Sequence, residues 1–214
     1  AGSRAGHAFV ASGTWLLVGR EQPQPDTSAT ARVAGFSNEQ ALPSGIRLLR
    51  NVAGWWLVEE CRRAWGDPPL DALLAQAARL AASEATFDAA DPRFVTPPDM
   101  PTAIARAGAL PDDASRAQLV RAAVDSMAAT TMRVIESLPR IGAAPCAGIR
   151  VFGGGARADL YLDALRARTT LPVSTGPIEA AALGNALAQG VALGAYSSAE
   201  AARATLRAME DDDR

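Results

Sequence analysis

Three short segments contain residue types that could hold a phosphorylated ligand. The first, Ser12-Gly13-Thr14, lies between two apolar runs and is predicted to form a tight turn. A tight turn exposes backbone N–H groups and Thr14 adds a hydroxyl donor, so the turn could bind an anion. The same tripeptide is common in turns that bind nothing, and that alternative stays open on spacing alone.

The second segment is a run of three glycines, Gly153, Gly154 and Gly155, which follows an apolar strand pattern at 149–152. Glycines at such a turn let the backbone approach a ligand closely. The positive N-terminal end of the following helix would favour a phosphate. The run matches neither the G-x-G-x-x-G motif nor a P-loop, and a plain strand-to-helix turn that needs positive φ is the alternative interpretation.

The third segment is the apolar stretch 46–65, which we predict to be one long buried helix because it is apolar nearly all round. Asn51 lies inside this stretch, and a buried amide needs a hydrogen-bonding partner. That partner could be a ligand, a backbone group or a water molecule. Glu59, two turns further on, is interpreted as a solvated helix residue.

The titratable side chains exclude several kinds of site. All basic residues are Arg, so the chain can supply neither a P-loop lysine nor a Schiff-base lysine. One histidine, His7, and two cysteines, Cys61 and Cys146, cannot form a His/Cys zinc site or a disulfide framework. The acid-rich stretch 88–99 could bind a cation, although its spacing matches no calcium loop. No nucleophile–base pair is visible, so no catalytic residue is assigned.

Composition indicates a globular protein without a strongly charged partner. The chain is 49% hydrophobic with a formal net charge of −2, which argues against nucleic-acid binding. No apolar run reaches the roughly 20 residues of a membrane span, and two scattered cysteines favour a reducing cytoplasm. The chain starts without Met or a signal-peptide pattern and leads almost directly into a strand, so we expect it to be part of a longer protein.

The spacing of apolar residues predicts an α/β chain. A β-hairpin, a helical block and a long helix precede a strand–helix–strand–helix unit, which implies parallel strands. Capping boxes at Ser115-Arg-Ala-Gln118 and Ser197-Ser-Ala-Glu200 mark the start of the long helix and of the last helix. The expected ranges are strands at 7–11, 15–19, 149–152 and 171–175, helices at 46–65, 70–83, 101–110, 115–138, 160–167, 179–193 and 197–209, an irregular stretch at 35–44 and a structured loop at 84–101.

Six motifs follow one another along nearly the whole chain. They are Ala-Ser12-Gly-Thr-Trp15, Phe36-Ser-Asn-Glu39, the segment 47–58, the segment 91–100, the glycine run and Gly176-Pro-Ile-Glu-Ala-Ala-Ala-Leu-Gly-Asn185. The segment 47–58 is close to the pattern Arg-X-Leu-Lys-Asn-X-X-Gly-X-Trp. Together the set resembles the C-terminal lobe of the FGGY family of carbohydrate kinases, and within that family it is most similar to the rhamnulokinases.

This resemblance implies an actin-like, ribonuclease-H-like α/β fold with helical insertions, in which ATP with Mg²⁺ binds between two lobes that close over the sugar. Thr14 would contact the terminal phosphates of ATP. Asn51 and Gly154 would line the nucleotide site, and Gly153 and Gly155 would shape the turn. The implied nucleotide-binding set is Ser12, Gly13, Thr14, Asn51, Glu59, Gly153, Gly154 and Gly155, without a metal ligand from the protein.

Two positions depart from the family pattern. Glu59 stands where rhamnulokinases often carry Gln. A carboxylate there would repel the phosphates of ATP, although it could accept a hydrogen bond from the ribose. Ala158 replaces the Asn that usually follows the glycine turn, which removes one adenosine-side contact.

The implied activity is transfer of the γ-phosphoryl group of MgATP to a hydroxyl of a ketose such as L-rhamnulose. Residues 1–214 would form a single C-terminal nucleotide-binding lobe. Its partners would be ATP, the sugar and the N-terminal lobe of the same protein, which supplies the catalytic Asp and most sugar contacts. Because that lobe is absent from this chain, we expect the chain alone to be inactive. A kinase for another sugar, such as xylulose or fuculose, and a non-catalytic actin-like nucleotide-binding domain are the alternatives.

Overall fold

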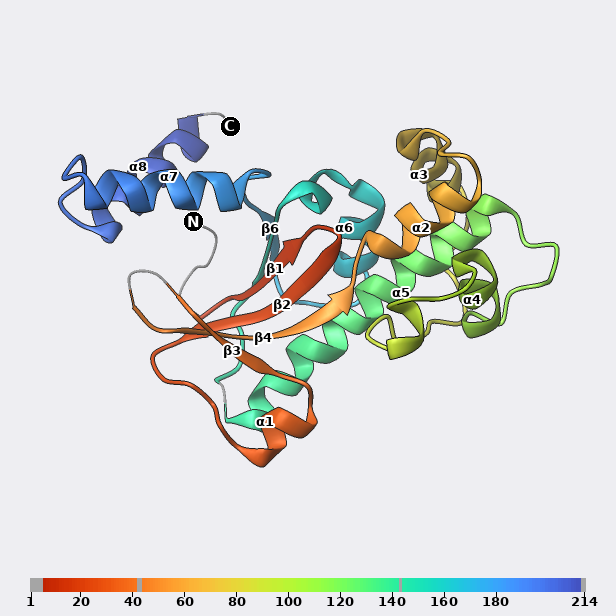
Figure 1. Ribbon diagram of the computed structural model, residues 1–214, viewed down its shortest axis with the longest axis horizontal. Coiled ribbons are helices and arrows are strands. Elements are labelled where there is room, and N and C mark those ends of the chain that lie inside the picture. The colour runs from red at the N-terminus through yellow and green to blue at the C-terminus, as the bar shows by residue number, and fades with distance from the viewer. Residues whose placement is uncertain (1–5, 42–43, 143, 213–214) are drawn as a thin grey trace.

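The computed structural model describes residues 6–41, 44–142 and 144–212. Within these residues a mixed sheet has six strands in the order β3-β4-β2-β1-β5-β6 (Figure 1). Neighbours from β3 to β1 are antiparallel, whereas β5 pairs in parallel with both β1 and β6. The strands are β1 (Ala8–Ser12), β2 (Trp15–Gln22), β3 (Ser37–Gln40), β4 (Ile46–Ala53), β5 (Ile149–Phe152) and β6 (Val173–Thr175).

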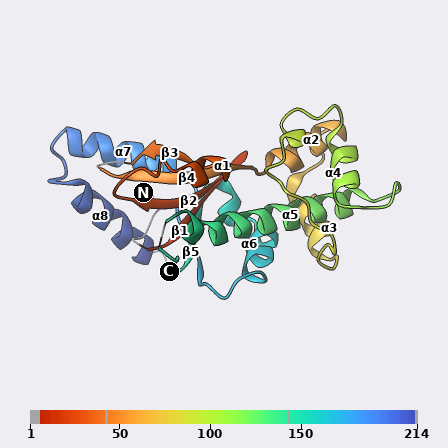
Figure 2. The ribbon, with the colours of Figure 1, turned by 90° about the horizontal axis from the view of Figure 1, so that it is seen from below.

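Most of the helices lie on one side of the sheet or at the two ends of the molecule. Figure 2 shows α5 and α6 on the same side of the sheet, with α2 to α4 gathered at one end and α7 with α8 at the other. The α-helices are α1 (Ala29–Val33), α2 (Trp56–Ala64), α3 (Leu70–Ala78), α4 (Met100–Ala107), α5 (Arg116–Ser137), α6 (Asp159–Arg166), α7 (Ala180–Ala192) and α8 (Ala199–Asp212), and short 3₁₀ turns span Pro92–Phe94, Leu138–Ile141 and Gly154–Arg157.

Helix α5 forms the core together with the sheet. It begins where the predicted capping box places it. Ser115 Oγ accepts a hydrogen bond from Gln118 N at 3.3 Å, and Gln118 Oε1 accepts one from Ser115 N at 2.8 Å. Its buried apolar side chains, Val124 and Met127 among them, belong to one cluster with Val10 of β1. Burial of each such side chain contributes about 1.5–3 kcal/mol relative to exposure.

The prediction of one helix over 46–65 is wrong. The first part, Ile46–Ala53, is β4, which pairs along its whole length with β2, and only Trp56–Ala64 is helical. Leu48 and Leu49 are both buried although adjacent strand residues point to opposite faces of a sheet. A strand that is buried on both faces is apolar at consecutive positions, and in the sequence this pattern is easily confused with a buried helix.

Two smaller predictions also need correction. The stretch 35–44, expected to be irregular, contains the edge strand β3, whose residues are polar and mostly exposed and therefore give no alternating signal. The last helix begins one residue later than its predicted cap. Ser198 Oγ, not Ser197, accepts the hydrogen bond from Ala201 N, at 3.1 Å.

The structured loop predicted at 84–101 is confirmed, and its order comes from side chains of α5. Phe87 N donates to Ser126 Oγ at 3.1 Å, and Ala89 N donates to Thr130 Oγ1 at 2.9 Å. Both hydroxyl-bearing residues are buried. Their oxygens satisfy loop N–H groups that have no strand or helix neighbour, and so allow the loop to lie in the interior.

Replacing Thr130 with Val keeps the side-chain volume but leaves the buried Ala89 N–H without an acceptor. We expect the free energy of unfolding to fall by about 1–3 kcal/mol in urea denaturation followed by circular dichroism. The exposed Thr102→Val is the matched control and should change it by less than about 0.5 kcal/mol. Equally small effects of both substitutions would show that the Thr130 hydroxyl does not hold the loop.

Candidate functional site

The turn between β1 and β2 is held by the beginning of α2. Trp55 N donates to Gly13 O at 3.2 Å, while Gly54 N and Trp56 N donate to Thr14 O at 3.2 and 3.0 Å. The carbonyl groups of the turn are therefore bound by the helix, and Thr14 itself stays exposed. The predicted hairpin turn is thus fixed in place with a hydroxyl-bearing residue open to solvent.

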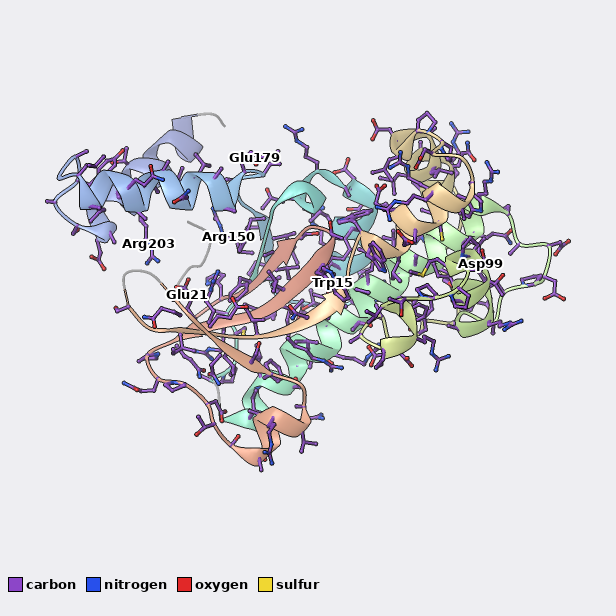
Figure 3. All side chains as sticks on the ribbon, in the orientation of Figure 1. Trp15, Glu21, Asp99, Arg150, Glu179 and Arg203 are labelled. Carbon is purple, nitrogen blue, oxygen red and sulfur yellow. The ribbon has the colours of Figure 1, made fainter. Side chains whose placement is uncertain are left out.

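The glycine turn lies beside the hairpin turn because β1 and β5 are parallel neighbours. Their register places Ala11 opposite Phe152, so the carboxyl ends of both strands lie at the same edge of the sheet, beside each other. Figure 3 labels Trp15, the first residue of β2, at this edge. Gly153 has a φ of +87°, which other residues rarely adopt, and its N–H donates to Pro177 O at 3.0 Å.

The other two glycines of the run differ in their surroundings. A Cβ atom on Gly155 would overlap Ser12 Oγ and the indole nitrogen of Trp55, whereas one on Gly154 would meet nothing within 4 Å. Gly155 is therefore a packing glycine. Gly154 borders open space, which allows a ligand to approach its backbone closely.

A series of contacts between buried side chains connects the hairpin turn to the core helix α5. Trp55 Nε1 donates to Ser12 Oγ at 3.2 Å, and the Trp55 ring meets Tyr161 edge-on with ring centroids 6.3 Å apart. The Tyr161 hydroxyl is 3.0 Å from the hydroxyl of Thr131 on α5, and burial raises the pKa of the phenol. We did not predict these partners, because they are distant in sequence and belong to no motif.

These elements line an open pocket of about 500 Å³. It lies between the hairpin turn, the glycine turn, α2 and α3. Six of the eight residues predicted to bind nucleotide line it. The lining residues are Ser12, Gly13, Thr14, Trp55, Glu59, Leu70, Asp71, Leu74, Gly154, Gly155, Arg157 and Ala158.

The remaining two predicted residues lie outside the lining. Gly153 lies against the backbone of Ser12, and its positive φ allows the chain to turn there. Asn51 is on β4 opposite Leu17, and it is exposed. Its expected place inside a buried helix is therefore wrong, and its amide needs no buried partner. Its contact with nucleotide stays a prediction.

The charges around the pocket are unevenly paired. The Glu59 carboxylate forms an ion pair with Arg62 at 2.5 Å, and Arg62 Nε also donates to Pro68 O at 2.9 Å. This pairing reduces the repulsion that a free carboxylate would exert on a phosphate. Arg157 is the basic residue of the lining, and it forms no ion pair within the described part of the chain. Ala158 also lines the pocket but offers no polar side chain.

The acidic side chains of the stretch 88–99 form ion pairs and a helix cap within the fold. Asp88 pairs with Arg133 at 3.6 Å, and Asp99 caps α4. Hydrogen bonds from Arg93 hold the pKa of Asp91 below its usual value. Among the described residues, no three acidic, histidine or cysteine side chains are grouped as a metal site.

The chain belongs to the FGGY family of carbohydrate kinases. Residues 8–193 match the sequence model of the family's C-terminal domain, described as "FGGY family of carbohydrate kinases, C-terminal domain". This match covers the strands, the two turns and the pocket described above.

Curated relatives refine this assignment. The chain is 35% identical over 190 residues to a rhamnulokinase of Bacteroides thetaiotaomicron, covering 87% of this chain and 39% of that protein. It is 35% identical over 200 residues to a rhamnulokinase of Pectobacterium carotovorum, covering 92% of this chain and 40% of that protein. The chain therefore spans about two fifths of the length of these relatives.

Solved structures confirm the predicted fold class. Plasmodium falciparum glycerol kinase, solved with ADP, superposes with a TM-score of 0.63 at 13% identity, over 94% of this chain and 41% of that one. A xylulose kinase from Rhodospirillum rubrum gives a TM-score of 0.58 at 18% identity, over 82% of this chain and 36% of that one. The α/β chain thus has the actin-like fold of sugar kinases.

In the part of the chain that the structure describes, none of the helices has both the length and the apolar character of a membrane-spanning segment.

The last two glycines of the run, Gly154 and Gly155, should respond differently to an added methyl group. We expect Gly155→Ala to lower the free energy of unfolding by about 1–3 kcal/mol, because its Cβ would displace Ser12 and Trp55. Gly154→Ala is the matched control one residue away and should change it by less than about 0.5 kcal/mol. Thermal and urea unfolding of the two variants would check this, and equal losses would contradict the described packing.

Proposed function

We propose that residues 1–214 form the nucleotide-binding lobe of an ATP-dependent sugar kinase. The observation that carries this proposal is the convergence of the hairpin turn and the glycine turn on one pocket. Both turns expose backbone to the same space, and such concavities bind phosphates. The family assignment is consistent with it, because carbohydrate kinases transfer phosphate to a sugar.

The residues of the pocket fit ATP. Gly154 leaves room for a phosphate beside its backbone, and Thr14 is an exposed hydroxyl-bearing residue of the same lining. Leu70 and Leu74 of α3 provide an apolar wall that suits a base. Mg²⁺ would be held mainly by the phosphates, since this ion is usually bound by one or two carboxylates together with phosphate oxygens and water.

The lobe would act by holding and orienting ATP. Phosphoryl transfer depends mainly on positioning and on neutralising charge, and asks for little covalent chemistry from the protein. Thr14 and the glycine turn would hold the phosphates at the sheet edge. Arg157 would add a positive charge. The general base and the sugar site would come from the other lobe of the whole protein, so we expect this chain to bind nucleotide without turning over sugar.

L-Rhamnulose is the proposed acceptor. The curated relatives at 35% identity are rhamnulokinases, whereas the xylulose kinase and glycerol kinase structures share only 18% and 13% identity with this chain. The whole protein is proposed to act in the cytoplasm, in keeping with the free thiols of Cys61 and Cys146. Assays of the whole protein with rhamnulose, xylulose and fuculose would decide the sugar, and no turnover of any of them would support a non-catalytic nucleotide-binding domain.

Calorimetric titration of MgATP tests the pocket. A Cβ atom at Gly154 would meet nothing within 4 Å, so the long side chain of Gly154→Arg should extend into the pocket, abolish saturable binding and leave the fold intact. Val33→Arg adds the same side chain at a position that is 84% exposed on α1 and should bind as the wild type does. Equal binding by both variants would place the nucleotide elsewhere.

The charge of Arg157 gives a second prediction. If its guanidinium contacts a phosphate, Arg157→Gln should weaken MgATP binding by about tenfold, since a hydrogen bond to a charged group is worth about 1.5–3 kcal/mol. Raising the salt concentration should reduce the difference between variant and wild type. The exposed Arg32→Gln on α1 is the control and should not alter affinity. Unchanged affinity of Arg157→Gln would remove this residue from the site.

A further inference from the structure

We propose that Trp55 is a positioning residue that sets the spacing between the hairpin turn and the glycine turn through the hydroxyl of Ser12. The inference rests on the proposed function, because it concerns the geometry of the same pocket. Trp55 contacts the hairpin turn twice. Its backbone N–H donates to Gly13 O at 3.2 Å, and its indole N–H donates to Ser12 Oγ at 3.2 Å.

The Ser12 hydroxyl is the point where the two turns meet. Ser12 is 1% exposed, and a Cβ atom on Gly153 would come within 2.6 Å of its carbonyl oxygen. Gly155 packs directly against both Ser12 Oγ and Trp55 Nε1. Rotation of the serine side chain, or loss of the indole, would therefore change how closely the glycine turn approaches β1.

Neighbouring side chains fix the orientation of the indole. Its ring meets Tyr161 edge-on, and the Tyr161 hydroxyl is bound to Thr131 of α5. Tyr161 and Thr131 are fully buried. The hydroxyl bond to α5 fixes the Tyr161 ring, and the edge-on contact with that ring limits how the indole can turn.

Position 55 is not one of the specified residues of the motif in its segment. The sequence pattern that the segment 47–58 resembles leaves the residue between Gly54 and Trp56 open, and tryptophan occupies that place here. Trp55 itself lines the pocket. A displacement of about 1 Å in a positioning group can cost about a hundredfold in rate, so this bond has consequences for binding and transfer.

Hydrogen exchange in the ligand-free chain gives the first test. Trp55→Phe keeps an aromatic ring and removes the N–H donor. Amide exchange should become about fivefold faster or more at the hydrogen-bonded Gly13 and Gly153, one in each turn. Trp65→Phe is the control, since its ring lies against Arg116 at the start of α5. Unchanged exchange at both glycines in Trp55→Phe would overturn the inference.

Nucleotide affinity gives the second test. Trp55→Phe and Ser12→Ala should each weaken MgATP binding by about tenfold, and the double variant should lose no more than either alone, because both remove one bond. Losses that multiply in the double variant would show that the two groups act separately and would reject the inference. If the wild-type chain binds no nucleotide, the proposed function fails, and hydrogen exchange still decides the role of Trp55.

Discussion

Helix α2 begins with backbone N–H groups that have no acceptor inside the helix, and the hairpin turn provides their acceptors. Such groups need partners when they are buried, and no side chain caps this helix. The carbonyls of Gly13 and Thr14 take that role. Gly54 permits the close approach, since a Cβ there would come within 2.8 Å of Gly13 O. Turn and helix therefore move as one body, and Glu59 on that helix keeps a fixed distance from the turn.

Local signals were enough to predict several parts of the fold. The capping box at Ser115 identified the start of α5, because both of its hydrogen bonds are made within four residues. The hairpin and the strand before Gly153 were predicted for the same reason, since short apolar runs ended by turn residues need no distant partner. The family motifs indicated eight nucleotide-binding residues, and six of these line one pocket in the structure.

Other features depended on contacts that only the folded chain makes. The strand β4 was taken for a helix because consecutive buried apolar residues, Leu48 with Leu49 and Val52 with Ala53, remove the alternating pattern of a strand. The bond between Trp55 and Ser12 joins residues 43 positions apart, and that between Tyr161 and Thr131 spans 30. Neither pair has a sequence signal of its own. Asn51 was expected inside a buried helix, but it lies on β4 and is exposed.

The parallel pairing of β1 with β5 also bears on how the chain folds as it is synthesised. About 140 residues separate the two strands, although they lie side by side. Closing so long a loop is entropically costly, and folds rich in such distant contacts form slowly. Until β5 leaves the ribosome, one edge of β1 has no partner and can pair with another chain. The strand that covers this side of β1 leads directly into the glycine turn, so one segment both protects β1 from such pairing and completes the pocket.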